Sequence, residues 1–258
     1  VIMKRTILSI SLVTFTLLSL FTACNNDGDD PTTPVKDSSV KLVFELYNDA
    51  NPMAWNDVVS VDNVNEYRME FFKFYLSNIT GLKSDGSWIS FKDVVLADAS
   101  KAEGMTFILD APSGAYDQLF LGLGLDPVLN AKDPISFAPE EPLSSAQAMY
   151  WSWATKYRFI RIDARANQLG SIGDTNDILV AYHPGADEFF KIVKLEKPFN
   201  LVAGSTTEYR IKVDVSLFFD GPGGVIDIPT EPQSHTTPDD YDLALKFTKN
   251  FAGAISPL

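Results

Sequence analysis

Apolar residues recur at every second position through much of the chain, a pattern that predicts β-strands. The alternation is clear at 40–46, 68–78 and 157–163, where aromatic and β-branched side chains also suit a half-buried sheet. Further short apolar runs lie at 94–96, 106–109, 116–125, 178–182, 189–201 and 207–215. With no visible internal repeat and no long amphipathic helix, the pattern predicts an all-β fold: an antiparallel β-sandwich-like domain with long loops.

Turn-forming residues separate these runs. The sequence His-Pro-Gly-Ala at 183–186 predicts a hairpin that joins 178–182 to 189–195. Residues 126–145 are rich in Pro, Asp and Ser, which predicts a long loop, and long loops inside compact domains are often functional.

Near the C-terminus, Leu243, Phe247 and Phe251 have helical spacing, and we expect a short helix there.

The N-terminal region has a different pattern. Two basic residues, Lys4 and Arg5, precede an apolar run at 7–23, which is short for a membrane span and typical of a secretory signal peptide. The run ends at Cys24, the only cysteine, in a sequence that resembles a lipobox. We therefore expect cleavage before Cys24 and lipidation of its thiol. The alternative is a signal peptide without lipidation, which would leave Cys24 free.

The residues after Cys24 are polar, acidic and interrupted by proline, a composition typical of a flexible tether. The expected organisation is a signal peptide at 1–23, a flexible acidic tether at 24–38 and a single β-rich domain at 39–258. Acidic residues behind the cysteine also resemble the export signal of Bacteroidetes-type lipoproteins. They favour an outer-membrane protein, lipid-anchored and exposed at the cell surface, with a periplasm-facing location as the alternative.

Charge and composition disfavour nucleic acid as a partner and limit the chemistry of the chain. The expected mature chain keeps 19 of the 21 basic residues against 34 acidic ones, a formal charge of −15. Nucleic acid is an unfavourable partner for such a chain, because binding it requires lysines and arginines that neutralise phosphates. The single cysteine excludes disulfides within the chain, and the only histidines are His183 and His235.

Motifs of catalysis are missing from the sequence. It contains neither G-x-S-x-G, nor a Walker motif, nor H-E-x-x-H, and Gly122-Leu123-Gly124 lacks the third glycine of a dinucleotide loop. We therefore expect a protein that is not an enzyme, with no catalytic or cofactor-binding residues.

Acidic clusters are the sequence's candidates for calcium, which prefers carboxylate and amide oxygens. They lie at 126–130, 174–177 and 239–242, and none has the spacing of an EF-hand loop. Asp and Asn are also the ordinary residues of turns, where their side chains bond to nearby backbone groups. Both interpretations, a calcium site and a turn, stay open at each cluster.

Aromatic residues and a methionine gather at 149–157, including Met149 and Trp151. Core packing explains such a group, but thioether groups also suit soft metals such as Cu(I). The sequence here resembles the MbnP-like family of methanobactin-partner and copper-repressible surface proteins. The resemblance rests on four segments: Phe-Tyr-Leu-Ser-Asn-Ile at 74–79, Leu-Gly-Leu-Gly-Leu-Asp at 121–126, Met-Tyr-Trp-Ser-Trp at 149–153 with Tyr-Arg-Phe at 157–159, and Tyr-His-Pro-Gly at 182–185.

This resemblance implies a β-rich envelope protein, and some members bind copper through several histidines and an oxidised tryptophan. The chain departs from that pattern, because two histidines cannot supply three imidazole ligands. The first hypothesis is a lipid-anchored protein that binds copper or another divalent metal through His183 and His235, with Met149 and Trp151 as neighbours. The alternative is a structural or partner-binding surface lipoprotein with at most a structural calcium ion, its envelope partner unknown. A metal site requires the two histidines to approach one another or a shared carboxylate.

Overall fold

A computed structural model of the chain describes residues 38–61, 63–151 and 156–258. The expected signal peptide, Cys24 and all of the expected tether except Ser38 lie outside the described residues. Within the described part, no helix is both long enough and apolar enough to cross a membrane.

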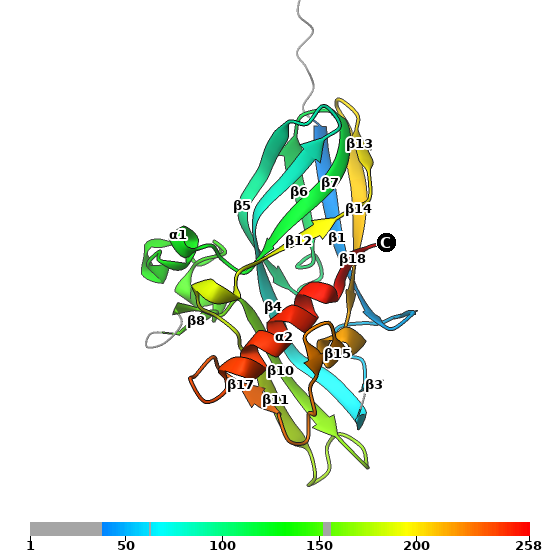
Figure 1. Cartoon of the computed structure of the whole chain (residues 1–258), viewed down its shortest axis with the longest axis vertical. Coiled ribbons are helices and arrows are strands. Elements are labelled where there is room, and N and C mark those ends of the chain that lie inside the picture. The colour runs from blue at the N-terminus through cyan, green and yellow to red at the C-terminus, as the bar shows by residue number, and fades with distance from the viewer. Residues whose placement is uncertain (1–37, 62, 152–155) are drawn as a thin grey trace, which may run out of the picture. The chain divides into compact units, whose positions relative to one another are not determined.

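Two β-sheets carry the fold (Figure 1). The smaller sheet contains β18 (Ile255–Pro257), β14 (Thr206–Asp214), β1 (Ser38–Asn48), β2 (Asn51–Pro52) and β6 (Thr106–Ala111). The larger contains β12 (Lys191–Leu195), β7 (Gly114–Leu123), β4 (Val64–Lys83), β10 (Ile160–Asn167), β11 (Ile178–Tyr182), β17 (Gln233–Ser234), β13 (Phe199–Leu201), β3 (Val59–Val61) and β5 (Trp88–Asp98). Two small ribbons, β8 (Tyr150–Trp151) with β9 (Lys156–Tyr157) and β15 (Asp220–Gly221) with β16 (Gly224–Val225), complete the strands.

The all-β class predicted from the sequence is confirmed. Most pairs are antiparallel, but β1 pairs with β14 and β11 with β17 in parallel, so both main sheets are mixed. The parallel β1–β14 pair joins segments far apart in sequence, with Ser39 opposite Thr206 and Tyr47 opposite Asp214. Periodicity identifies strands but carries no information about such distant pairing.

The alternating residues form the core, as the pattern predicts. In β1, Val40, Leu42, Phe44 and Leu46 are buried while the residues between them are partly exposed. The expected C-terminal helix is α2 (Tyr241–Gly253), and its Phe251 packs against Phe72 and Phe74 of β4 in the larger sheet. The Phe247 ring stacks on Tyr182 of β11 with 4.6 Å between the ring centroids. The apolar residues of this segment therefore follow the helical spacing and not the alternation of a strand.

Two of the motif segments hold β4 and β7 together. Asn78 takes a left-handed backbone with φ of 48°, and its amide donates to Asp126 Oδ2 at 2.9 Å. The register between the strands shifts at this point. A Cβ on Gly122 would lie 2.6 Å from the Ser77 carbonyl oxygen, and Gly124 has φ of +90°. Close backbone approach thus requires Gly122 and a left-handed backbone favours Gly124, so neither glycine needs a nucleotide to explain it.

The long loop predicted after β7 contains α1 (Pro127–Asn130) and two short 3₁₀ turns, η1 (Pro134–Ser136) and η2 (Ser145–Gln147). Two core tyrosines fasten it. The Tyr75 hydroxyl donates to the Pro142 carbonyl and the Tyr157 hydroxyl donates to the Leu143 carbonyl, each at 2.9 Å. The loop therefore rests on a second core cluster beside the main one.

The hairpin predicted between 178–182 and 189–195 is wrong. β11 pairs with β10 and β17, whereas β12 pairs with β7 at the far side of the sheet. The Pro184 carbonyl instead accepts a hydrogen bond from Phe159 N at 2.7 Å, and the chain continues through a 3₁₀ turn at Asp187–Phe189 (η3). Proline and glycine signal a change of direction, but the strand that follows can pair elsewhere.

Candidate metal centre

Three segments that are distant in sequence meet at a cluster of rings, which we call the histidine cluster: Trp151, Arg158, His183 and His235. Ring centroids are 5.0 Å apart for the two histidines, 5.9 Å for Trp151 and His183, and 5.3 Å for Trp151 and His235. Both histidines predicted from the sequence are therefore neighbours, with the predicted Trp151 against each of them.

Parallel pairing of β11 with β17 brings the histidines together. Tyr182 lies opposite Ser234, so the residues that follow them, His183 and His235, lie side by side. The backbone N–H of His183 donates to the Ser234 carbonyl at 2.8 Å, and that of His235 donates to Asp240 Oδ2 at 2.7 Å. Trp151 arrives from the β8–β9 ribbon, where it pairs with Lys156.

Asp163, on the neighbouring strand β10, orients His183. Its Oδ1 lies 2.6 Å from His183 Nε2, and Arg161 holds the other oxygen at 2.7 Å. Burial raises the pKa of Asp163, but the hydrogen bond and charge of His183, together with Arg161, bring that pKa below its ordinary value. An ionised carboxylate can only accept, so Nε2 of His183 carries the hydrogen.

The other ring nitrogen of His183 is therefore a free lone pair when the imidazole is neutral. Burial lowers the pKa of His183, and Asp163 offsets this only partly, so the ring is neutral at pH 7. Its side chain is 8% exposed, and Nδ1 has no hydrogen-bond partner among the described residues. A buried acceptor without a partner costs free energy unless a ligand occupies it. The carboxylate–imidazole arrangement is also the one that usually supports a metal-bound histidine.

Arg158 also contacts the Trp151 ring. Its guanidinium carbon lies 4.4 Å from the Trp151 ring centroid, a cation–π contact. Burial and the charge of Arg161 lower the pKa of Arg158 to about 10, which leaves it protonated at neutral pH. Its Nη1 donates to the Ala148 carbonyl at 3.1 Å. The tryptophan ring thus contacts one cation and two imidazoles.

Backbone strain concentrates around this cluster. Six described residues other than glycine have positive φ, and four of them flank the segments that carry the rings: Ala148, Lys156, Ala186 and Thr236. Ala186, with φ 79° and ψ 152°, takes a conformation that glycine usually occupies. Thr236 also binds the turn, because its Oγ1 accepts from Gly185 N at 3.2 Å. Such conformations persist where the surroundings fix them and are frequent at functional sites.

Met149 lies apart from the rings. Its side chain is fully buried in the second core cluster with Tyr75, Tyr157 and Phe159. The sequence left core packing open as a role for Met149, and the structure shows this residue packed in the core.

Sequence reasoning missed Asp163, and it gave no role to Arg158, although Arg158 lies in the motif segment 157–159. Asp163 lies opposite Ala181 in the antiparallel β10–β11 pair, two positions before His183 on the facing strand. Diagonal neighbours of this kind are within reach of long side chains. The sequence did show an acidic residue in a predicted strand. Placing that residue beside His183 requires knowledge of which strands pair and in which register.

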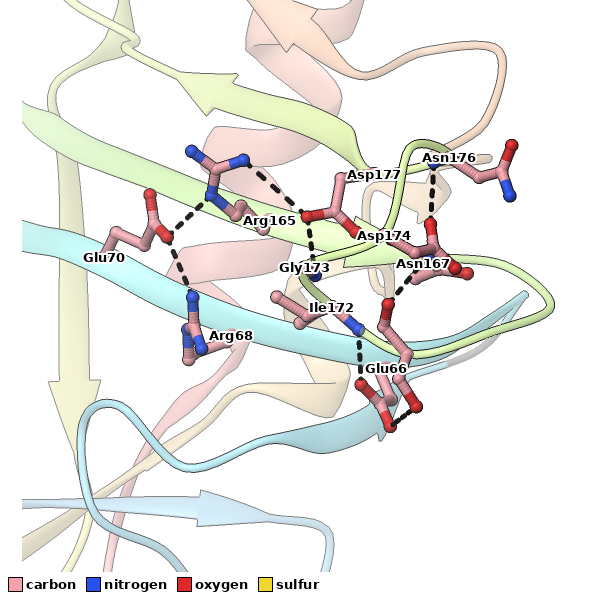
Figure 2. Close-up of polar contacts among 11 residues, drawn as sticks. Glu66, Arg68, Glu70, Arg165, Asn167, Ile172, Gly173, Asp174, Asn176 and Asp177 are labelled. Carbon is pink, nitrogen blue, oxygen red and sulfur yellow. Dashed lines mark hydrogen bonds and ion pairs between the residues drawn. The ribbon is translucent and has the colours of Figure 1, made fainter.

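The acidic clusters form turns. The best example lies between β10 and β11, where the buried amide of Asn167 donates to Ser171 O, Asp174 Oδ1 and Asp177 Oδ1 (Figure 2). Asp177 Oδ2 accepts from Gly173 N at 2.9 Å, and Asp174 Oδ1 also accepts from Asn176 N at 2.6 Å (Figure 2). Across the described ranges, no group of three or more His, Cys, Asp or Glu residues is arranged to hold a metal ion.

The two other acidic clusters bond in the same way. Asp126 caps α1 through Oδ1, which accepts from Val128 N at 2.7 Å and Leu129 N at 3.0 Å. Asp240 accepts from the backbone N–H groups of His235 and Thr237. These carboxylates satisfy backbone donors, as Asp does in turns and at helix starts.

Comparison with known proteins gives one family. The model of the MbnP family matches residues 37–237, a range that includes Trp151, His183 and His235. Among solved structures, MbnP from Methylosinus trichosporium is similar at 16% sequence identity with a TM-score of 0.48. The aligned part covers 72% of this chain and 79% of that chain. A search of curated proteins found no match.

Proposed function

The chain belongs to the MbnP family, and from that premise we propose that it binds copper in the cell envelope through the histidine cluster. His183 and His235 are the ligands in this proposal, with Trp151 beside both rings. When bound, copper would supply a redox-active cation. The proposal describes a binding protein rather than an enzyme.

One observation carries the proposal: Nδ1 of His183 is buried, carries a lone pair and lacks a hydrogen-bond partner among the described residues. Its ring neighbour His235 lies at 5.0 Å between centroids, so a second imidazole is close to the same space. Asp163 fixes the tautomer that leaves Nδ1 free to bind. These residues fit a metal held by imidazole nitrogens.

The number of ligands favours copper over other metals. Structural zinc sites are normally bound by four protein ligands and calcium by six to eight oxygens. The described part of the chain offers no group of three metal-binding side chains of the usual types. Imidazole suits copper, and copper binds most tightly among the divalent first-row metals, so a small ligand set retains it best.

The test is copper content of the chain purified without chelator, incubated with copper and dialysed. We expect stoichiometric copper in the wild type and none in His183→Ala. Asp239→Ala is the matched control, because Asp239 is an exposed acid near His235 in sequence, and it should bind copper normally. Copper that persists in both His183→Ala and His235→Ala would contradict the proposal and leave a partner-binding surface lipoprotein as the function.

Attachment by lipid is the second part of the proposal. It is supported by the sequence alone, through the apolar run that ends at Cys24. In the native host, Cys24→Ser should move the protein from the membrane fraction to the soluble fraction. Protease added to intact cells should digest the anchored wild type if it is surface-exposed and spare it if it faces the periplasm.

A further inference from the structure

A groove of about 470 Å³ lies between β12 and the end of α2, far along the sheet from the histidine cluster. Its walls are apolar and basic. The apolar part includes Ile192, Val193, Ala252 and Ile255, and the basic part consists of Lys191, Lys194 and Lys249. Among the described residues, no acidic side chain lines it.

The groove faces the edge of a strand rather than one of its faces. Four consecutive residues of β12, 191–194, line it. Successive side chains of a strand point to opposite faces, so a run of four in one wall means that the backbone edge itself is turned to the groove. Within the described ranges, β12 pairs only with β7. Its second edge thus offers unpaired N–H and C=O groups, which can template another strand.

The charge of the groove contrasts with that of the chain. The whole sequence carries a formal charge of −13, yet three lysines are among the residues that line this groove. In the described part of the chain, Lys249 makes no ion pair, and the Lys191 Nζ donates to the Glu188 carbonyl rather than to a carboxylate. Lys194 has one exposed partner, Glu196, and exposed pairs of this kind contribute little. The groove therefore attracts anionic groups.

We propose that the free edge of β12 docks an extended acidic segment of a partner protein, which adds to the sheet as a further strand. Backbone hydrogen bonds to β12 supply the pairing, and the three lysines select acidic side chains. Ile192, 55% exposed, gives the added strand an apolar contact. The site is independent of the copper proposal, because its lining includes no residue of the histidine cluster.

The same lysines disfavour a second copy of this chain as the occupant. Pairing β12 with β12 would place lysines of both copies together, and like charges facing across strands are destabilising. Lysines on edge strands commonly prevent such self-pairing. An acidic strand removes the repulsion, so the edge discriminates between the two occupants.

The probe is a fluorescent peptide of alternating Glu and Val, whose binding to the full chain is followed by anisotropy. We expect saturable binding that weakens as salt rises from about 0.05 to about 0.5 M. Hydrogen exchange of the backbone amides at 191–195 should slow in the complex. The same peptide methylated at alternate backbone nitrogens keeps its charge but cannot pair as a strand, and it should not bind.

Charge reversal gives the variants. Lys194→Glu with Lys249→Glu should weaken peptide binding by at least about tenfold. The matched control is Lys92→Glu with Lys132→Glu, the same change of charge at exposed lysines outside the groove, and it should bind within about twofold of the wild type. His183→Ala should bind the peptide normally, which separates this site from the copper proposal.

Three results would overturn the inference: equal binding of the methylated peptide, equal loss in the control variant, or no binding at all. Vesicles of phosphatidylglycerol provide the alternative anion. Vesicle binding that depends on the groove lysines, without peptide binding, would also overturn it in favour of a membrane surface.

Discussion

The two ends of the β10–β11 pair both contain aspartates, but they differ in whether every buried polar atom has a hydrogen-bond partner. At the connecting loop, the carboxylates of Asp174 and Asp177 accept hydrogen bonds from amide and backbone N–H groups. At the other end, Asp163 is satisfied, yet the imidazole it orients keeps a buried nitrogen without a partner in the described residues. Acidic composition therefore does not identify a ligand site in this chain. The copper proposal rests instead on a buried lone pair that has no hydrogen-bond partner among the described residues.

The largest expected effect is on the loop. Asn167→Ala removes an amide that is 1% exposed and makes five hydrogen bonds, so the free energy of unfolding should fall by about 3 kcal/mol. Urea denaturation measures it. Copper binding should be unchanged once the protein is folded. Asn176→Ala is the control, because Asn176 takes part only through its backbone N–H. A loss of copper in Asn167→Ala would mean that the two ends are not independent.

Asp163→Asn tests the orientation of His183. An asparagine amide can donate to Nε2, which allows the tautomer that puts hydrogen on Nδ1 and removes the lone pair. Copper affinity should fall by about 10- to 100-fold, as for other partners of metal-bound histidines. Competition with a copper chelator measures the affinity. Asp93→Asn, an exposed acid on β5, should bind as the wild type does. Unchanged affinity in Asp163→Asn would exclude Asp163 as a positioning residue.

Acid should destabilise the histidine end at a milder pH than the loop. The pKa of His183 is lowered in the folded chain, so the unfolded chain binds more protons once the pH drops below the ordinary value of about 6.5. Stability contributed by the neutral ring is thus present above that pH and is lost below it, by at most about 1.4 kcal/mol per pH unit. The slope should disappear in His183→Gln. The lowered pKa values of Asp163 and Asp177 give losses only at lower pH, near the carboxylate range.

The smallest expected effect is that of calcium. Since N–H donors already occupy the carboxylates of the loop, calcium in millimolar excess should shift the melting temperature by less than about 1 °C, the result for a ligand that does not bind. Thermal melts with calcium and with a chelator compare the two states. A saturable rise in melting temperature would restore calcium as a ligand of this end.

Periodicity predicted the strands, and it predicted them well where one face is buried, as in β1 and β10. It also located β11 and β12, but their predicted pairing as a hairpin was wrong, because turn residues at 183–186 do not determine which strand the following segment joins. The residues of the candidate site were also predicted only in part. The sequence identified Trp151, His183 and His235 and included Arg158 in a motif segment, whereas the place of Asp163 required the register between β10 and β11.

The motif segments themselves divide into two kinds once the structure is known. Asn78, Gly122 and Gly124 maintain the close approach of β4 and β7. Trp151 and His183 instead present rings to a common space. Both kinds look alike in sequence, because a motif alone does not say whether a residue maintains the fold or lines a candidate site. Only the surroundings of each residue separate them.

The parallel pairing of β1 with β14 has a consequence for the time course of folding. The first strand of the domain has β6 on one side and must wait for residues 206–214 on the other. Contacts across so much of the chain make the search for the native state slow, because a large loop must close before they form. During synthesis, most of the domain would emerge from the ribosome while one edge of β1 stayed bare. The chain thus remains open to chaperones and proteases until its C-terminal quarter is available.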